Sequence, residues 1–287
     1  MQFKLTRIAP TPSGYLHIGN AYSFALTAAL AKNTGAEILL RIDDLDRDRI
    51  ERAYLDDVFD TLNFLAIPWQ RGPLNAEDHE HKWSQLSRLN IYGPAMDRLA
   101  EQGYVFACVC SRRQLQTAGY ECNCSEKNIP LETKGAAWRL FTDDRVLNIS
   151  TLTQGSVTAM LPRAMKNFVV RKKDGYPAYQ LTSLLDDVHF NVDLIVRGED
   201  LWASTIAQHY LASILGINAF IESTFHHHKL IMADSESKLS KSAGSTSIRH
   251  MRGQGMSPAN IYTQIGNLFS PQIKIIDWRD LSHNLQM

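Results

Sequence analysis

The first residues that suit chemistry lie in a turn near the N-terminus. Residues 11–20, TPSGYLHIGN, place a proline, two glycines and His17 directly before an apolar stretch with helical spacing. A glycine-containing turn at the start of a helix presents backbone N–H groups where a phosphate can bind, and His17 adds a side-chain donor. Many such loops bind nothing, so a plain strand-to-helix connection stays equally open for this segment alone.

A second segment, SKLSKSAGS at 237–245, places Lys238 and Lys241 three residues apart among small hydroxyl residues. Two such cations can neutralise a polyphosphate, and the serines and glycine leave the loop free to move. Taken alone, the segment is typical of a solvated flexible loop. Together with residues 11–20, it predicts a nucleotide-binding site.

All cysteines of the chain lie in the segment CVCSRRQLQTAGYECNC, with the spacing C-x-C-x₁₁-C-x-C. Four thiolates so close together can surround one tetrahedral Zn²⁺ and fix a loop that has little core of its own. Two disulfides are an alternative, disfavoured by cytosolic redox conditions and by the strain of a C-x-C bridge. Free structural thiols are another. We predict a structural zinc ion held by Cys108, Cys110, Cys122 and Cys124.

Composition limits the class of protein. The chain has 287 residues, of which 44% are hydrophobic and 21% charged, as in ordinary globular proteins. Lys plus Arg equals Asp plus Glu at 30 each, which argues against non-specific coating of nucleic acid. No apolar run approaches the roughly 18 residues of a membrane span, and the N-terminus lacks a signal-peptide core. We expect a cytoplasmic protein that does not contact membranes.

The elements that must position these residues alternate between strand and helix. Residues 3–9 have a strand pattern, 21–35 have helical spacing ending on a glycine, and 36–42 form a continuous apolar run typical of a buried strand. Acidic residues 43–49 lead into another amphipathic helix that reaches about Leu65. This alternation predicts an α/β fold with a doubly wound parallel sheet.

The pattern changes in the middle of the chain and then returns. One clear helix, around 84–102, and the cysteine segment lie between two α/β parts, and the second part has a strand at 192–198 and a helix at 203–216. We therefore predict a Rossmann-like catalytic domain in two halves, split by an inserted α+β module with a zinc loop. The expected boundaries are 1–75, 76–176 for the module, 177–236, and 237–287 for the lysine loop and a short C-terminal tail.

The two phosphate-type segments resemble the signatures of a known family. HIGN resembles the HIGH signature and KLSKS the KMSKS signature of class I aminoacyl-tRNA synthetases. Six segments follow the order and approximate spacing of glutamyl-tRNA synthetase catalytic domains: RIAPTPSGYLHIGN, LLRIDDLDRDR, GYVFACVCSRRQL, DGYPAYQLTSLLDD, VRGEDL and HKLIMADSESKLSKS. The resemblance covers most of residues 5–245. It implies an ATP-dependent ligase that uses Mg²⁺ with ATP and joins a glutamate carboxylate to the α-phosphate.

The resemblance also implies a role for individual residues. His17, Lys238 and Lys241 match the residues that neutralise phosphoryl charge. Asn20 stands where many class I enzymes have His, a departure that is common in the glutamyl branch. His226 to His228 lie in a strand whose side chains alternate in direction, so they cannot share one ion, and we expect His228 to line the nucleotide site. The implied ATP-binding set is Pro10, His17, Gly19, Asn20, His228 and Lys241.

Glutamate recognition needs at least one arginine and one carboxylate. Arg7 and Arg197 match the family's arginines for the substrate carboxylates, and both end strands of the predicted sheet, where open α/β sheets bind ligands. The resemblance assigns a hydroxyl contact to Ser13 and an aromatic wall to Tyr179. Asp43 stands where the family usually has Glu, so the carboxylate for the substrate ammonium is one methylene shorter, and the pocket must shift by roughly an ångström, or use a water, to keep the contact.

The family places a zinc site in this insertion, with Cys108 and Cys110 matched. Its other ligands vary between relatives, so Tyr120 is a candidate ligand in place of Cys122 or Cys124.

Residues 246–287 are too few for the helical anticodon-binding region of full-length relatives. The match is closest to truncated members, which attach glutamate to the queuosine base in the anticodon loop of tRNA(Asp). We expect a monomer that binds ATP, L-glutamate and tRNA, preferably this anticodon stem-loop. Arg112, Arg113 and the segment 171–173 are candidates for phosphate contacts.

Three alternatives stay open. The chain could be a minimal glutamyl-tRNA synthetase, or a glutaminyl relative, that charges a tRNA 3′ end. It could be a non-catalytic paralogue that binds nucleotide or tRNA, although His17 and both lysines are intact. It could also be a small nucleotidyltransferase of the same superfamily, which would have no use for a zinc insertion.

Overall fold

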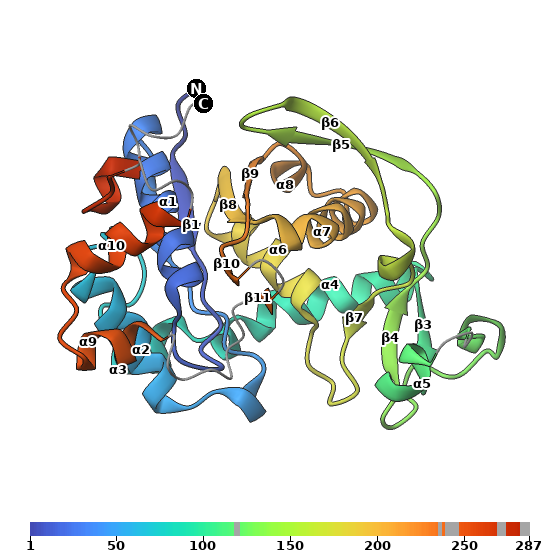
Figure 1. Ribbon diagram of the computed structural model, residues 1–287. Helices are drawn as coiled ribbons and strands as arrows, with labels where there is room; N and C mark the ends of the chain where they lie inside the picture. The colour runs from blue at the N-terminus through green and yellow to red at the C-terminus, as the bar shows by residue number, and fades with distance from the viewer. Residues whose placement is uncertain (118–120, 235–236, 239–246, 269–273, 282–287) are drawn as a thin grey trace.

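A six-stranded sheet in the order β2-β1-β8-β9-β5-β6 runs through the centre of the protein (Figure 1). The computed structural model describes residues 1–117, 121–234, 237–238, 247–268 and 274–281. All neighbours in the sheet are parallel except β6, which is antiparallel to β5. The strands are β1 (Leu5–Ile8), β2 (Glu37–Leu40), β8 (Leu194–Gly198), β9 (Thr224–His228), β5 (Val146–Thr151) and β6 (Gly155–Met160).

One face of the sheet is covered by α1 (Ile18–Thr34), which connects β1 to β2. The helix begins three residues before the expected 21–35 because His17 caps its N-terminus, and it ends at Gly35 with φ 77°. α1 is buried on nearly every side, with Ala21, Ala25 and Ala29 fully covered, and small side chains let it lie close to the strands.

The C-terminal segment covers the outer side of α1. It contains α9 (Ile248–Gly253) and α10 (Pro258–Asn267), and α10 supplies buried apolar side chains to the same core as α1 and α2 (Arg52–Phe64). Trp278 Nε1 donates to the carbonyl of Ala66 at 2.8 Å. The segment expected as a tail is therefore a packed part of the catalytic unit.

The opposite face is covered by α6 (Tyr179–His189), α7 (Trp202–Leu215) and α8 (Asn218–Ile221). Helices on both faces of a mainly parallel sheet confirm the predicted doubly wound α/β fold. The edge of the sheet at β2 is covered by the chain at Gly72, whose φ is 108° and where a Cβ would lie 2.2 Å from the Leu40 oxygen. Only glycine permits that approach.

The inserted part has its own three-stranded antiparallel sheet, in the order β3-β4-β7. Its helix occupies much of the expected 84–102, as a 3₁₀ turn at Gln85–Arg88 followed by α4 (Leu89–Glu101). The region also contains α3 (Ala76–Asp78), β3 (Val105–Cys108), α5 (Arg112–Gln116), β4 (Ala137–Leu140) and β7 (Val169–Arg171). Later in the chain, β10 (Met232–Asp234) and β11 (Ser237–Lys238) form a separate two-stranded sheet.

The β5–β6 hairpin departs from the expected boundaries. It lies within 76–176, but Thr151 pairs with Phe225 of β9, so the hairpin extends the main sheet (Figure 1). Leu147 and Ile149 alternate with exposed residues and join the core under α7. Burial of these two side chains favours pairing of the hairpin with the main sheet over packing within the module. No helix in the described ranges is long and apolar enough to cross a membrane.

Candidate active site

A cavity of about 520 Å³ lies at the carboxyl ends of β1, β2 and β8, beside the N-terminus of α1. Strand ends of this kind are where open α/β sheets bind ligands. The cavity brings together residues that are distant in the sequence and that we had singled out: Arg7, Pro10, His17, Gly19, Asn20, Asp43, Tyr179, Arg197 and His228.

His17 has a structural role that explains its place before the helix. Its Nδ1 accepts the backbone N–H of Gly19 at 3.1 Å, and its own N–H donates to Asn20 Oδ1 at 3.1 Å. This reciprocal capping box fixes the ring, and because Nδ1 accepts, the proton of the neutral imidazole lies on Nε2. A Cβ at Gly19 would lie 3.0 Å from His17 Cε1, so a larger residue would push the ring aside.

The turn is also held from outside by two segments that the sequence did not indicate. The N–H of Leu16 donates to Asp57 Oδ2 at 2.8 Å, and the Leu16 carbonyl accepts from the N–H of Ile248 at 2.8 Å. Asp57 belongs to α2 and Ile248 to α9, so the packed C-terminal segment directly fixes the turn that carries His17.

Three arginines gather on the α6–α7 side of the sheet. Arg7 lies in β1, Arg41 directly follows β2, and Arg197 lies in β8. Arg7 pairs with Leu39, and Arg41 lies two residues after Leu39, so both arginine side chains point to the same face of the sheet. Thr6 pairs with Leu194, so Arg7, one residue after Thr6, and Arg197, three residues after Leu194, also share that face. All three line the cavity.

Arg197 is 4% exposed, and it lacks a carboxylate within ion-pairing distance among the described residues. Its Nη2 donates to Thr205 Oγ1 at 2.6 Å and to Gln208 Oε1 at 2.9 Å. Its Nε and Nη1 are buried with no hydrogen-bond partner in the part of the chain that the structure describes. Burial lowers the pKa of Arg197 to about 10. Spare donors on a buried cation are suited to a carboxylate ligand.

Asp43 is held by Arg41, two residues before it. Its two carboxylate oxygens accept from Arg41 Nε at 2.8 Å and Nη2 at 3.0 Å. Burial raises the pKa of Asp43, and the Arg41 cation opposes this shift. Sequence reasoning singled out Asp43 but missed Arg41, although their spacing along an extended segment puts both on one face.

The remaining expected residues are placed differently. Ser13 is not among the residues that line the cavity, and its hydroxyl accepts from Arg49 Nη2 at 3.2 Å. Tyr179 lies at the cavity rim and is 41% exposed. Lys238 lies in β11, and Lys241 and Tyr120 lie outside the described residues.

The three consecutive histidines of β9 alternate as expected for a strand. His228 Nε2 lies 3.0 Å from Ser23 Oγ of α1 and lines the cavity. His227 points to the other face, where its Nε2 lies 2.7 Å from Thr205 Oγ1. Burial lowers the pKa of His226 to about 4 and that of His227 to about 3, so both rings are neutral at physiological pH.

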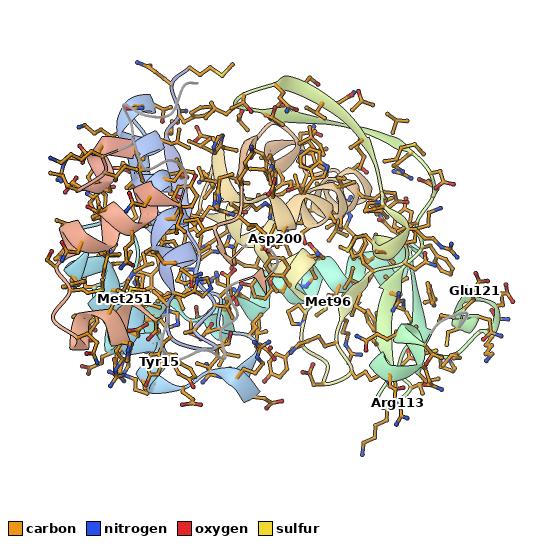
Figure 2. All side chains as sticks on the ribbon, in the orientation of Figure 1. Tyr15, Met96, Arg113, Glu121, Asp200 and Met251 are labelled. Carbon is orange, nitrogen blue, oxygen red and sulfur yellow. The ribbon has the colours of Figure 1, made fainter. Side chains whose placement is uncertain are left out.

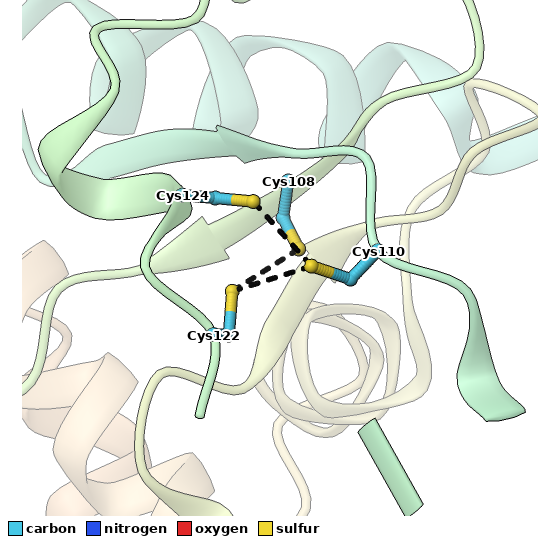
Figure 3. Close-up of side chains that lie close together, drawn as sticks. All are labelled: Cys108, Cys110, Cys122 and Cys124. Atoms are coloured by element: carbon cyan, nitrogen blue, oxygen red, sulfur yellow. Dashed lines mark hydrogen bonds between the residues drawn. The ribbon is translucent and has the colours of Figure 1, made fainter. Parts of the chain in front are cut away.

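The four cysteines converge on one point, although Cys108 ends β3, Cys110 follows it, and the other two come from the segment after α5 (Figure 3). Their sulfur atoms all lie within 4.8 Å of one another, and Cys110 Sγ is 3.7 Å from Cys122 Sγ and 3.5 Å from Cys124 Sγ. Tetrahedral Zn–S bonds of about 2.3 Å imply S···S separations of about 3.8 Å, whereas a disulfide needs about 2.05 Å. The geometry fits four ligands of a metal ion and not two disulfides.

The cysteine loop is remote from the cavity. Figure 2 shows Arg113 and Glu121 at one end of the molecule and Asp200, a cavity residue, near its centre. A metal ion held there would stabilise the loop and would not touch a ligand in the cavity.

Comparison with known proteins identifies the class. The family model described as class I tRNA synthetases (E and Q), catalytic domain, matches residues 5–145 and 139–277. The chain therefore belongs to this family of ligases, and its sheet with an inserted module is the Rossmann-like fold of the class I synthetases.

Individual relatives are similar over most of the chain. The glutamyl-Q tRNA(Asp) synthetase of Rhodobacter capsulatus is 30% identical, covering 91% of this chain and 99% of that protein. The protein of the same description from Nitratidesulfovibrio vulgaris is 32% identical, covering 89% and 83%. Glutamate–tRNA ligase 2 of Syntrophus aciditrophicus is 28% identical over 92% of this chain, which spans only 57% of that relative. A crystal structure of glutamate-tRNA synthetase from Elizabethkingia anophelis has a TM-score of 0.71 at 19% identity, covering 98% of this chain and 65% of that one.

Proposed function

We propose that the protein activates L-glutamate with ATP and transfers it to a tRNA. The observation that supports this most strongly is Arg197, a buried cation whose Nε and Nη1 have no partner among the described residues and which lines the cavity beside His17. A substrate carboxylate supplies the acceptors that these donors lack.

The charge of the cavity favours glutamate over glutamine. Three buried arginines, Arg7, Arg41 and Arg197, face two buried carboxylates, Asp43 and Asp187, so the cluster carries one excess positive charge. Glutamate has a net charge of −1 and glutamine is neutral. Burying an uncompensated cation is costly, so the anionic amino acid is the better complement.

In the proposed reaction, an oxygen of the glutamate α-carboxylate attacks the α-phosphorus of ATP. The bond from that phosphorus to the bridging oxygen breaks, and pyrophosphate leaves with the electron pair. Arg7 and Arg197 hold the substrate carboxylates, and His17 Nε2–H and the N-terminus of α1 face the phosphoryl charge. ATP enters as its Mg²⁺ complex. Lys238 and Lys241 stay a prediction from the sequence.

The activation step is tested by pyrophosphate exchange into ATP without tRNA. We expect exchange that depends on glutamate and Mg²⁺, with glutamine and aspartate at least about 10²-fold poorer in kcat/KM because neither matches both charge and length. Wild-type protein that gives no exchange, or that accepts glutamine equally well, would contradict the proposal.

For the acceptor we propose the queuosine base in the anticodon loop of tRNA(Asp). The relatives named for this activity support it, because the similarity runs over 83% to 99% of their length. Tyr179 at the cavity and the turn that precedes it in the sequence also suit a single-stranded loop: Tyr179 and Tyr176 are 41% and 36% exposed, and Lys172 Nζ lies 5.7 Å from the centre of the Tyr176 ring. Lys173 reaches from the same turn to the carbonyl of Val109. Aromatic rings interleaved with cations bind unpaired bases by stacking.

We expect Tyr176→Ala combined with Lys173→Gln to lower transfer to queuosine-containing tRNA(Asp) by about tenfold, since one stacking ring and one cation are lost. Glutamate-dependent exchange without tRNA should be unchanged. The matched control is Lys166→Gln. Lys166 precedes β7, whereas Lys173 follows it, and Lys166 is paired with Asp144, so this variant should leave transfer intact.

An isolated anticodon stem-loop should accept glutamate nearly as well as the whole tRNA, with binding that weakens steeply as salt rises. Glutamate found instead on the terminal adenosine of tRNA(Glu) would make the protein a minimal glutamyl-tRNA synthetase.

For the cysteine site we propose one structural zinc ion per chain. Because the surrounding cluster is small, consisting of Phe106 and the four cysteines with two further partly buried neighbours, Leu115 and Ile129, the loop depends on the metal for its order. We expect elemental analysis of protein purified without chelator to give one zinc. Cys110→Ser should increase hydrogen exchange in the loop far more than in the main sheet, and protein without zinc would refute the assignment.

A further inference from the structure

Two adjacent aspartates of α6, Asp186 and Asp187, are both fully buried, at 0% and 1% exposure, yet they serve different parts of the protein. Asp187 contacts the arginines of the cavity. Asp186 contacts the inserted module, where its carboxylate accepts from Arg88, Tyr92 and Gln85. Neither residue lines the cavity.

A single oxygen of Asp187 joins two of the cavity arginines. Its Oδ1 accepts from Arg7 Nε at 3.1 Å and from Arg41 Nη1 at 2.7 Å. Arg7 Nη1 donates in turn to the carbonyl of Val196 at 2.9 Å. These bonds hold Nε–H and one N–H of Nη1, so among the described residues Arg7 keeps its Nη2 donors and the second Nη1 N–H for a ligand in the cavity.

Two cations so close together in a buried place repel each other unless a negative charge lies between them. Asp187 supplies that charge to Arg7 and Arg41. Arg41 is then free to hold both oxygens of Asp43, as observed. Without Asp187, Arg7 would lose the bond that sets the direction of its guanidinium.

We propose that Asp187 is the positioning residue of this site, which aims Arg7 at the side-chain or α-carboxylate of the amino acid while it touches no substrate itself. The inference rests on the proposed function, since it assigns Arg7 to glutamate. It predicts that Asp187 affects the binding of the amino acid and not that of ATP, because the ion pairs of Asp187 in the described part of the chain are with Arg7 and Arg41.

The test compares Asp187→Asn and Asp187→Glu with Asp186→Asn, a matched control on the same helix with equal burial. KM values for glutamate and for ATP are measured separately in pyrophosphate exchange, together with the unfolding temperature. We expect both Asp187 variants to raise the KM for glutamate about tenfold or more, the effect of misplacing one charge-assisted hydrogen bond, with little change in the KM for ATP. Asp186→Asn should lower the unfolding temperature and leave both KM values unchanged.

A second measurement separates positioning from a general loss of charge. In an Arg7→Lys background, Asp187→Asn should add little further to the KM for glutamate, because residues that act through one another are not additive. Additive effects, an equal rise in the KM for ATP, or an Asp186→Asn variant with the same KM change would overturn the proposal.

Failure to fold is also decisive. Asp187→Glu keeps the buried charge, and if neither Asp187 variant folds, the residue serves stability and the proposal is wrong. Wild-type protein without glutamate-dependent exchange would instead refute the proposed function, whereas an active wild type with unaffected Asp187 variants would refute only this inference.

Discussion

Replacing Arg197 by Gln is expected to lower kcat/KM for glutamate in pyrophosphate exchange by about 10²–10³-fold, because a substrate carboxylate would be buried without its cation. Arg197 is the cavity cation with the least compensation in the free protein, since its Nε and Nη1 lack partners among the described residues. The unfolding temperature of this variant should not be lower than that of the wild type, and it should be higher where the buried, uncompensated charge of Arg197 destabilises the free protein. Exchange kinetics and thermal unfolding on the same preparations measure both.

Arg197→Lys is the control for charge alone. Lysine keeps the positive charge but cannot offer two parallel donors to a carboxylate, so we expect most of the activity to be lost in this variant too. Gln208→Glu would place an acid beside the guanidinium, where Gln208 Oε1 already accepts from it, and should compete with the substrate. An Arg197→Gln variant with exchange close to that of the wild type would remove the residue from the site.

The second large effect concerns His17, whose two roles can be separated. His17→Asn should lower kcat of exchange by about 10²-fold, because a donor to the developing phosphoryl charge is lost. Asn is among the best N-cap residues, so the start of α1 should be retained. His17→Ala removes the cap as well and should cost about 1 kcal/mol of stability in addition.

The comparison of the two variants decides the role of the ring. Equal exchange in His17→Asn and the wild type would mean that His17 serves only as a helix cap, through the bond that its Nδ1 accepts from the Gly19 N–H. Loss of exchange in both variants, with loss of stability only in His17→Ala, is the result that we expect.

The sequence predicted the parallel sheet because its apolar periodicity is local. The runs at 3–9 and 36–42 became β1 and β2, and the helix between them formed with only its start misplaced. The error at that start has a physical cause: an imidazole can cap a helix as Ser or Asp does, and no apolar pattern signals it. The cysteine spacing likewise predicted the convergence that Figure 3 shows, because four thiols in one short segment can meet with little help from the rest of the chain.

The sequence could not predict contacts between distant segments. Nothing near Leu16 indicates that Asp57 and Ile248 hold it, and the β5–β6 hairpin gave no sign that it would rejoin the main sheet at Phe225. The packing of residues 258–267 against α1 could not be predicted either, because an amphipathic pattern shows that one face of a helix is buried but not which element it packs against.

By itself, then, the sequence predicted where chemistry could take place: at the histidine turn, at Arg7 and Arg197 in their strands, and at the thiol cluster. Only the tertiary structure decided how the charges are shared. Arg41 is paired with Asp43, and Asp187 lies between Arg7 and Arg41. Arg197 keeps Nε and Nη1 without hydrogen-bond partners among the described residues. The reason is that ion pairing depends on distances of a few ångströms between side chains, and those distances arise when α6 packs on the sheet more than a hundred residues after β2.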